Sequence, residues 1–309
     1  MAEHVHYPVL LHEAVESLNI QPDGIYIDGT FGRGGHSAEI LKALGSEGRL
    51  IGFDKDDQAV AAAEARFGGD PRFTMVKGSF ASMGEWAAER GVAGRVNGIF
   101  LDLGVSSPQI DDAGRGFSFR MDGPLDMRMA STGMSAAEWI ADVERQPLAD
   151  VIREYGEERF AWKIAGAIVA ARDEAPIETT EQLANIIRTA SPTREHRIDA
   201  ATRSFQGIRI HINRELDDLK DCLEDIFEVL AVGGRLSVIS FHSLEDRIVK
   251  QFIRTHSTAD VYPRGLPVRE DQMRKPPLRA IGKAVRASKQ EIAENVRSRS
   301  AIMRCAEKQ

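Results

Sequence analysis

The chain has 309 residues, of which 42% are hydrophobic and 28% are charged, and its formal net charge is −7 at pH 7. This composition is that of an ordinary globular protein, and the length predicts a core domain with an insertion or a second lobe. No apolar run approaches the ~20 residues that a membrane span requires. Residues 1–8 lack the basic and apolar regions of a signal peptide. We therefore expect a cytoplasmic protein with no membrane segment.

The charged residues and the cysteines limit the partners and the cofactors. Residues 186–214 contain six arginines against two acids, and residues 264–289 contain eight Lys or Arg against two acids, which gives local balances of +4 and +6. Segregated positive charge on an acidic protein is typical of a surface that follows phosphates, although a solvated surface is the simpler alternative. Cys222 and Cys305 form no metal-ligand spacing, so we expect no metal, and Cys222 is expected to be a small buried residue of a helix.

The first half of the chain alternates predicted strands with predicted helices, which indicates a parallel sheet. Residues 24–27 form an apolar strand that enters the turn Asp28-Gly-Thr-Phe-Gly-Arg-Gly-Gly-His36, and a helix follows over 37–44. Further strands are expected at 48–53, 72–77 and 96–101, with a helix at 58–66. Three acids, Asp28, Asp54 and Asp102, therefore come directly after strand ends, where open α/β sheets bind their ligands.

The glycine-rich turn favours one cofactor over another. A dinucleotide fingerprint needs a third glycine after Gly32 and Gly34, but Ser37 occupies that position. Asp28 would repel a pyrophosphate and suits a cationic or amine-bearing ligand, while Asp54 stands where such folds place the acid that holds ribose hydroxyls. S-adenosylmethionine has an ammonium, a sulfonium and a ribose, and no phosphate. The pattern therefore favours S-adenosylmethionine over NAD, with a turn that binds no cofactor as the alternative.

The alternation stops after Asp111, and no convincing strand is predicted before Glu215. We expect one helix over 147–172, and another from Thr179, whose spacing to Gln182 is typical of a capping box. The sheet resumes with a helix over 219–230, a glycine pair that ends it, and a strand over 231–241. His242 follows that strand, and a last strand is expected at 299–305. The domains are therefore a core at 1–110, a helical insert at 111–215 and the rest of the core at 216–309.

Several blocks of the sequence, taken together, resemble the RsmH family, also called MraW. The likeness runs from near Tyr7 to near Lys308. Its blocks are Tyr7–Glu13, Asp28–His36, Asp102–Gln109, Gly123–Arg128, Phe205-Gln206 with Arg209-Ile210, Phe241–Arg247 and Glu294–Ser300. The resemblance implies an α/β, class I (Rossmann-like) S-adenosylmethionine-dependent methyltransferase core with an inserted helical domain. It also implies transfer of a methyl group to N4 of cytidine 1402 in 16S ribosomal RNA of the small ribosomal subunit, with the insert in RNA recognition.

The resemblance also implies the site residues. Gly34, Gly35 and His36 would line the cofactor, and Asp54 would hold its ribose. Phe80 would contact the adenine side, whereas Asp102 and Gln109 would lie near the methionine end.

Methyl transfer to a cytosine amine needs a group that accepts a hydrogen from the nitrogen. Asp102 is our choice for this catalytic role, with a backbone carbonyl near Pro108 and His242 as open alternatives, because Asp102-Leu-Gly-Val-Ser-Ser-Pro108 departs from the usual amino-methyltransferase motif.

Two other functions stay open at this point. The first is a DNA or small-molecule amino-methyltransferase on the same core, and a small-molecule enzyme would not need the basic stretches. The second is a non-enzymatic RNA-binding assembly factor, against which the intact cofactor motif argues. The sequence does not determine the oligomeric state, a homodimer included, nor how the target cytidine is exposed, nor which basic residues contact RNA.

Overall fold

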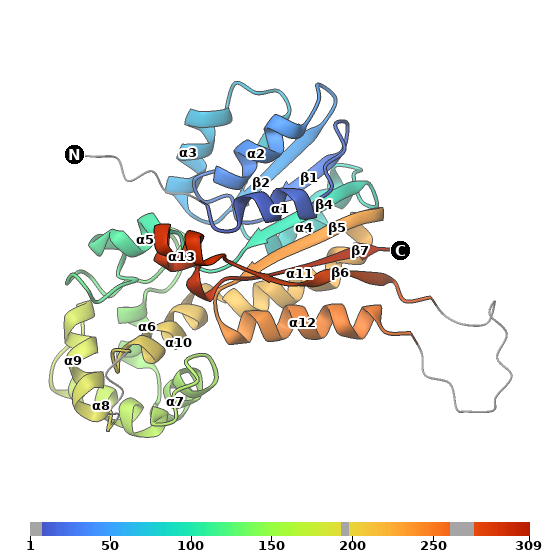
Figure 1. The fold of residues 1–309 in the computed structure, drawn as a ribbon. Coiled ribbons are helices and arrows are strands. Elements are labelled where there is room, and N and C mark those ends of the chain that lie inside the picture. Colours follow the sequence, from blue (N-terminus) through green and yellow to red (C-terminus); the bar gives the residue numbers. More distant parts are fainter. Residues whose placement is uncertain (1–7, 193–197, 260–274) are drawn as a thin grey trace, which may run out of the picture. The chain divides into compact units, whose positions relative to one another are not determined.

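The computed structural model describes residues 8–192, 198–259 and 275–309, and its contacts divide the chain into two compact units (Figure 1). Met1–Gly104 and Asp217–Gln309 together form the first, here called the sheet unit. Val105–Leu216 forms the second, called the helical unit. The sequence placed these boundaries at 110/111 and 215/216. No helix in the described ranges is both long enough and apolar enough to cross a membrane.

The sheet unit is built on a seven-stranded sheet in the order β3-β2-β1-β4-β5-β7-β6. The strands are β1 (Ile25–Asp28), β2 (Arg49–Asp54), β3 (Phe73–Lys77), β4 (Val96–Asp102), β5 (Leu230–Ser240), β6 (Leu278–Arg286) and β7 (Ile302–Lys308). The first five are parallel, and β7 runs antiparallel to both β5 and β6. Since β1 pairs with β2 on one side and β4 on the other, the strand order reverses between β1 and β4. Open α/β sheets bind ligands at the carboxyl ends of strands at such a point.

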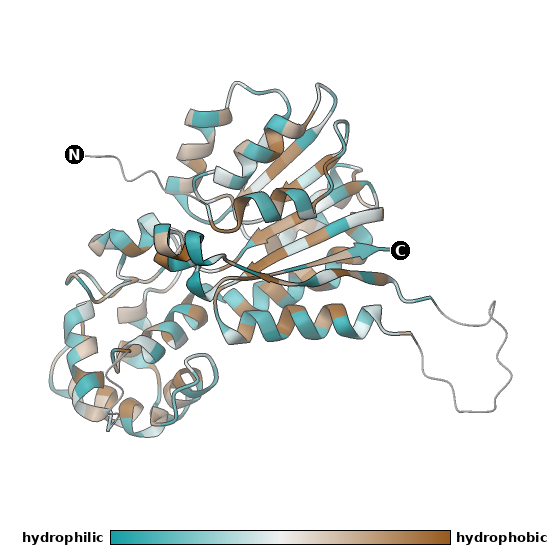
Figure 2. Cartoon of the chain, viewed as in Figure 1, coloured by the Kyte–Doolittle hydropathy of each residue, from teal (hydrophilic) through white to brown (hydrophobic). Residues whose placement is uncertain are grey.

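Alternate residues of the central strands pack into separate cores on the two faces of the sheet. On β4, Ile99 and Leu101 pack against α4, α11 and α12, whereas Phe100 packs against α1 and α2. This alternation is the period-2 pattern of a strand covered on both faces, and the apolar positions are visible along the strands in Figure 2. The helices of the sheet unit are α1 (Leu11–Ser17), α2 (Gly35–Ala43), α3 (Asp57–Phe67), η1 (Phe80–Ser82), α4 (Met83–Glu89), α11 (Glu215–Val229), α12 (Ser243–Ser257), α13 (Lys289–Glu294) and η4 (Val296–Ser300). Cys222 is fully buried in α11, as predicted.

The helical unit has its own apolar core, to which Ile140, Ile164, Ile187 and Phe205 contribute. Its elements are α5 (Ser107–Asp111), η2 (Ala113–Arg115), α6 (Ala136–Asp142), α7 (Arg145–Glu154), α8 (Ala161–Glu174), α9 (Thr180–Ala190) and α10 (Thr202–Asn213). Within its described residues no strand forms beyond a single bridge between Pro124 and Thr179. The predicted capping box is confirmed, since the Thr179 hydroxyl accepts from the Gln182 amide.

Two predictions were wrong, one strand was missed and one strand begins later than predicted. The helix expected over 147–172 is two helices, because Gly156 lies against α10: a Cβ there would be 2.4 Å from the Arg203 carbonyl oxygen. The glycine pair 233–234 does not end a helix but lies within β5, where the register to β4 shifts. Strand β6 was missed, and β7 begins three residues after the predicted start at 299.

Candidate active site

Asp28, at the end of β1, holds the glycine-rich turn in place. The carboxylate is buried; its Oδ1 accepts from the Thr30 amide at 3.1 Å and its Oδ2 from the Ser37 hydroxyl at 2.6 Å. Burial raises the pKa of Asp28 to about 6, against these two hydrogen bonds, which lower it. Both oxygens therefore hold the glycine-rich turn and the first turn of α2, and the expectation that this acid suits a cationic ligand stays a prediction.

Asp54, at the end of β2, also organises backbone. Its Oδ2 accepts from the Gly32 amide at 2.8 Å, and its Oδ1 accepts from the Asp56 amide at 2.9 Å. Burial raises the pKa of Asp54. The Lys55 amide is a third backbone donor to the carboxylate, and because two carboxylate oxygens offer about four lone-pair sites, one site remains for a hydroxyl donor. The hydrogen bond from Gly32 therefore fixes the position of the Asp54 carboxylate, an acceptor for ribose hydroxyls, relative to the glycine-rich turn.

Two glycines of the turn, Gly34 and Gly35, stand where neighbouring side chains leave no space for a Cβ. Gly34 has φ +70°, and a Cβ on it would lie 2.5 Å from Cζ of Phe31. A Cβ on Gly35 would lie 2.3 Å from Cγ of Pro8. Gly34 caps α2 and Gly35 is its first residue, so the chain passes from strand to helix with its backbone closely packed, as a turn that approaches a ligand requires.

His36 and Asp102 meet at the carboxyl edge of the sheet, with His36 Nδ1 3.8 Å from Asp102 Oδ2. The His36 ring is buried against Phe100, and its Nε2 lies 3.0 Å from the Val9 carbonyl oxygen. A carbonyl only accepts, so we assign the hydrogen of neutral His36 to Nε2. Burial lowers the pKa of His36 to about 4. His36 therefore presents an unprotonated Nδ1 to Asp102 at neutral pH.

Asp102 is the carboxyl group with the fewest donors at this edge. Its backbone amide donates to the Thr30 hydroxyl at 2.6 Å, but its Oδ1 is buried without a hydrogen-bond partner among the described residues. Burial raises the pKa of Asp102 well above the usual range, and the nearby charges of Asp28 and Glu245 raise it further. About 25% of the side chain is nevertheless exposed. Asp102 is thus a basic carboxylate that a ligand can still reach.

Glu245 was missed by the sequence reading, although its position was a usable signal. It stands three residues after His242, the N-cap of α12, in the spacing of a capping box. Its Oε2 accepts from the Phe241 amide at 2.8 Å and the His242 amide at 3.2 Å, and its Oε1 lies 3.0 Å from His242 Nε2. The Glu245 carboxylate therefore holds the backbone and the ring of His242 in place at the end of β5.

Phe80 lies just past β3, on the segment that Asp218 holds. Ser79 donates to the Asp218 carboxylate, and Lys55, which follows β2, forms an ion pair with it. Phe80 is half-buried, and a Cβ on Gly29 would lie 2.9 Å from its Cβ. The ends of β1, β2 and β3 are thereby held together in the sheet unit.

Gln109, the remaining predicted cofactor residue, belongs to the helical unit. It is buried in α5, and its Oε1 accepts from the Ser106 amide at 2.8 Å. The observed role of this side chain is therefore to cap α5, and its contact with a cofactor stays a prediction. Asp28, Asp54, Asp102, Gly34, Gly35, His36 and Phe80 all lie in the sheet unit.

A comparison with known families decides between the remaining readings. The model of the MraW methylase family matches residues 3–309. The chain belongs to the MraW methylase family. A proposed rRNA methylase from Clostridium thermocellum has 13% identity and a TM-score of 0.45, with 99% of this chain and 100% of that chain covered.

Two streptococcal structures are similar to a comparable degree. A rRNA methylase from Streptococcus thermophilus has 13% identity and a TM-score of 0.43, with 98% of both chains covered. A proposed methyltransferase from Streptococcus mutans, solved with S-adenosylhomocysteine, has 10% identity and a TM-score of 0.45, with 98% of this chain and 100% of that chain covered. These scores are low, and the assignment to the family rests on the sequence match.

Membership of the MraW methylase family confirms the predicted fold class, a Rossmann-like methyltransferase core, and S-adenosylmethionine as the cofactor. The residues at the carboxyl edge of the sheet fit this cofactor. The turn at Gly34 and Gly35 admits no side chain, Asp54 keeps one free acceptor site, and Asp102 lacks a donor at its buried oxygen. The hydroxyl and ammonium groups of the cofactor are hydrogen-bond donors, whose hydrogen bonds Asp54 and Asp102 can still accept.

The predicted basic stretches are partly neutralised within the chain. In the first, Arg209 forms a two-point ion pair with Glu215, and Arg188 pairs with Asp199. In the second, Arg279 pairs with Glu307. Arg194, Arg197 and the basic residues at 264, 269 and 274 lie outside the described residues. The described part of each stretch therefore carries less free charge than the sequence suggested.

Proposed function

We propose that this methylase transfers the methyl group of S-adenosylmethionine to N4 of cytidine 1402 in 16S ribosomal RNA. Family membership supplies the reaction class, a methyl transfer to ribosomal RNA. The observation that carries the finer assignment is Asp102, a carboxylate at the strand-order reversal that is partly exposed yet short of donors. The exocyclic N4 amine of cytosine has hydrogens that it can donate to the Asp102 carboxylate.

The chemistry of the amine explains why this carboxylate matters. The N4 lone pair of cytosine is delocalised into the ring, so the nitrogen is a weak nucleophile until positive charge can develop on it. Asp102 accepts a hydrogen bond from the amine and then its proton, and the interaction strengthens as charge develops. Burial and like charges raise the pKa of Asp102, which brings the base closer to the working pH. The cofactor, when bound, supplies an electrophilic methyl group on its sulfonium.

The same reading assigns roles to the predicted cofactor residues. Gly34, Gly35 and His36 line the cofactor, and Asp54 holds the ribose through its remaining acceptor site. Phe80 contacts the adenine side, and Gln109 and Asp102 lie at the methionine end. His36, whose Nε2 is held by the Val9 carbonyl oxygen, is neutral and adds no positive charge beside Asp102.

The RNA partner is assigned to the helical unit and to the basic residues. Residues 111–215 recognise the RNA, and the target is the small ribosomal subunit in the cytoplasm. The arginines of this unit that face solvent, such as Arg214, offer contacts to phosphate. His242 and the backbone near Pro108 remain the alternative acceptors for the amine hydrogen, although His242 lies 3.0 Å from Glu245.

Mass spectrometry of 16S RNA nucleosides tests the proposal. Cells without the protein should lose N4-methylcytidine at position 1402, and the wild-type gene should restore it, whereas the Asp102→Ala variant should not. Unchanged N4-methylcytidine in the cells without the protein would overturn the proposal. If a different methylated nucleoside is lost, the protein is still an RNA methylase, but its target is not cytidine 1402.

A further inference from the structure

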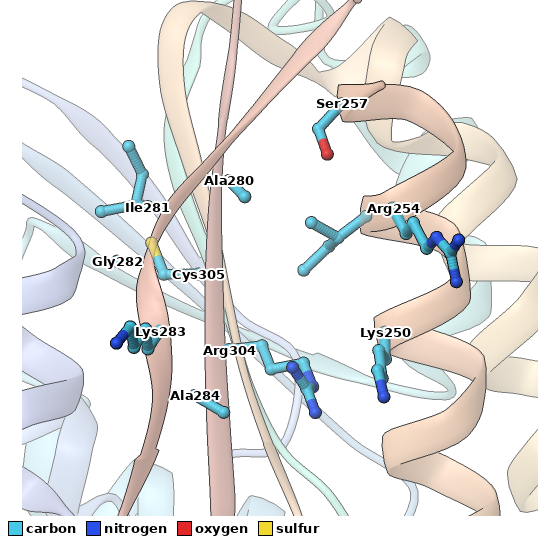
Figure 3. Close-up of a pocket in the computed structure, with 11 residues that line it drawn as sticks. Lys250, Arg254, Ser257, Ala280, Ile281, Gly282, Lys283, Ala284, Arg304 and Cys305 are labelled. Carbon is cyan, nitrogen blue, oxygen red and sulfur yellow. The ribbon is translucent and has the colours of Figure 1, made fainter. Parts of the chain in front are cut away.

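The sheet unit has a pocket of about 220 Å³ between α12 and the outer strands β6 and β7 (Figure 3). Four cationic residues line it, and none of the lining residues is acidic. These cations are Lys250 and Arg254 of α12, Lys283 of β6 and Arg304 of β7. The pocket is separate from the carboxylates at the strand ends, and no role in the proposed reaction has been assigned to it.

An irregularity in the sheet forms one wall of this pocket. Ile281 pairs with Cys305 and Val285 pairs with Met303, so three residues of β6 stand opposite Arg304 alone. Gly282, within this bulge, has φ +65° and open space where a Cβ would be. A bulge twists and bends its strand. Here it places Gly282, Lys283 and Ala284 at the rim instead of in regular pairing.

Arg304 is held so that one nitrogen remains available. Its Nε and Nη2 donate to the two oxygens of Asp246, at 2.7 and 3.1 Å. No described residue accepts a hydrogen bond from its Nη1. Figure 3 shows the nitrogen ends of Arg304 and Lys250 at the same end of the pocket, one from β7 and one from α12. The charged ends of Arg254 and Lys283 turn outward at its edges.

The charge of these residues is not balanced locally. Asp246 neutralises Arg304, but Lys250, Arg254 and Lys283 form no ion pair with any residue in the described ranges. All three are exposed. Three uncompensated cations around one concave site on a protein of net charge −7 attract an anion.

The size and position of the pocket indicate which anion it takes. Its volume is below the ~300 Å³ that pockets for whole small molecules start from, so it accommodates a group and not a nucleotide. Lys250 lies seven residues after the start of α12, about 10 Å along the helix at 1.5 Å per residue. That helix starts beside the carboxyl edge of β5, so a polyanion there has a short path to this pocket.

We propose that this pocket binds a backbone phosphate of the RNA substrate, with Lys250 and Arg304 as its ligands. The inference rests on the proposed function, because it takes the substrate to be RNA. Arg254 and Lys283 add long-range attraction at the rim. The pocket positions the RNA on the sheet unit and reads no base, since phosphate contacts carry no sequence information.

Fluorescence anisotropy with a short labelled single-stranded RNA, measured between 50 and 200 mM salt, tests the pocket. Lys250→Ala should weaken binding about five-fold, the size of one partly solvated ion contact, and should reduce the salt slope by about 0.7. Lys250→Arg should keep most of the affinity. Arg95→Ala, which removes an exposed arginine just before β4, is the matched control and should leave both quantities unchanged.

Two further arms separate the possible failures. Cofactor affinity, measured by calorimetry, should be the same in all these variants. Inorganic phosphate at constant ionic strength should compete with RNA on the wild type more than on Lys250→Ala. If phosphate binds the wild type through Lys250 but Lys250→Ala binds RNA normally, the pocket is a site for free anions and the inference is wrong. If N4-methylcytidine is unchanged without the protein, the proposed function fails whatever the pocket does.

Discussion

Replacement of Asp28 by Asn should flatten the pH dependence of stability. In the folded chain the pKa of Asp28 is raised from 3.8 to about 6, mainly by burial. Native protein therefore favours the protonated form, so the stability that Asp28 contributes is fully present below its unfolded pKa and is lost as the pH rises through about 6. Asn has no charge to bury, and its amide can exchange hydrogen bonds with Ser37 and Thr30 in the same places.

The expected magnitude follows from the shift. A difference of about two pKa units corresponds to roughly 3 kcal/mol at 1.36 kcal/mol per unit. About half of this loss of wild-type stability has already occurred at pH 5, and roughly 1.4 kcal/mol more is lost between pH 5 and pH 8. The free energy of unfolding of Asp28→Asn, relative to the wild type, should therefore rise by that amount across this range.

Urea unfolding at several pH values between 5 and 8 measures the effect. Asp54 and Asp102, whose pKa values are also raised, are present in both proteins, so the difference between the two curves reports Asp28 together with its charge effect on Asp102. Asp23→Asn changes an exposed aspartate before β1 and serves as the control. Parallel curves for the wild type and Asp28→Asn would refute the reasoning, because burial would then not penalise the charge.

Three further results are expected. Asp54→Ala should weaken S-adenosylmethionine binding on the order of 10- to 100-fold, as lost charge-assisted hydrogen bonds do, and calorimetry showing wild-type affinity would contradict its assignment. Asp102→Ala should slow methyl transfer on the order of 10²–10³-fold at saturating cofactor in single-turnover assays, and full rescue at saturation would assign Asp102 to cofactor binding instead. Gly34→Ala should cost more than about 1–2 kcal/mol, because φ +70° and contact with Phe31 both oppose a Cβ, whereas Gly69→Ala, in open space, should lower the thermal midpoint little.

The sequence predicted the first four strands well because each is an apolar run with a clear end. Glycines or an acid follow β1, β2 and β4 directly, and these local signals do not depend on distant contacts. Strand β6 carried no such pattern. It is mostly exposed and becomes a strand through pairing with β7. Likewise, the break between α7 and α8 follows from the approach of α10 to Gly156, which sequence periodicity cannot show.

The sequence predicted where the residues of the candidate site lie better than it predicted what each of them does. That Asp28, Asp54 and Asp102 share one edge follows from parallel strands alone. Which of them is free to meet a ligand depends on Thr30, Ser37 and the turn amides, whose partners only the folded chain defines. The short spacing from His242 to Glu245 was readable, but its relevance required knowing that the charge of Glu245 acts on Asp102.

The split of the sheet unit into two segments has a consequence for synthesis of the chain. Strand β4 pairs with β5, yet the 112 residues of the helical unit (105–216) are made between them. At the usual ~5–20 residues per second, the ribosome needs on the order of 6–20 s for that stretch. During this time β4, with Ile99, Phe100 and Leu101 all buried in the final fold, is an unpaired edge that other strands can join. We expect that a chaperone protects β4 until β5 emerges.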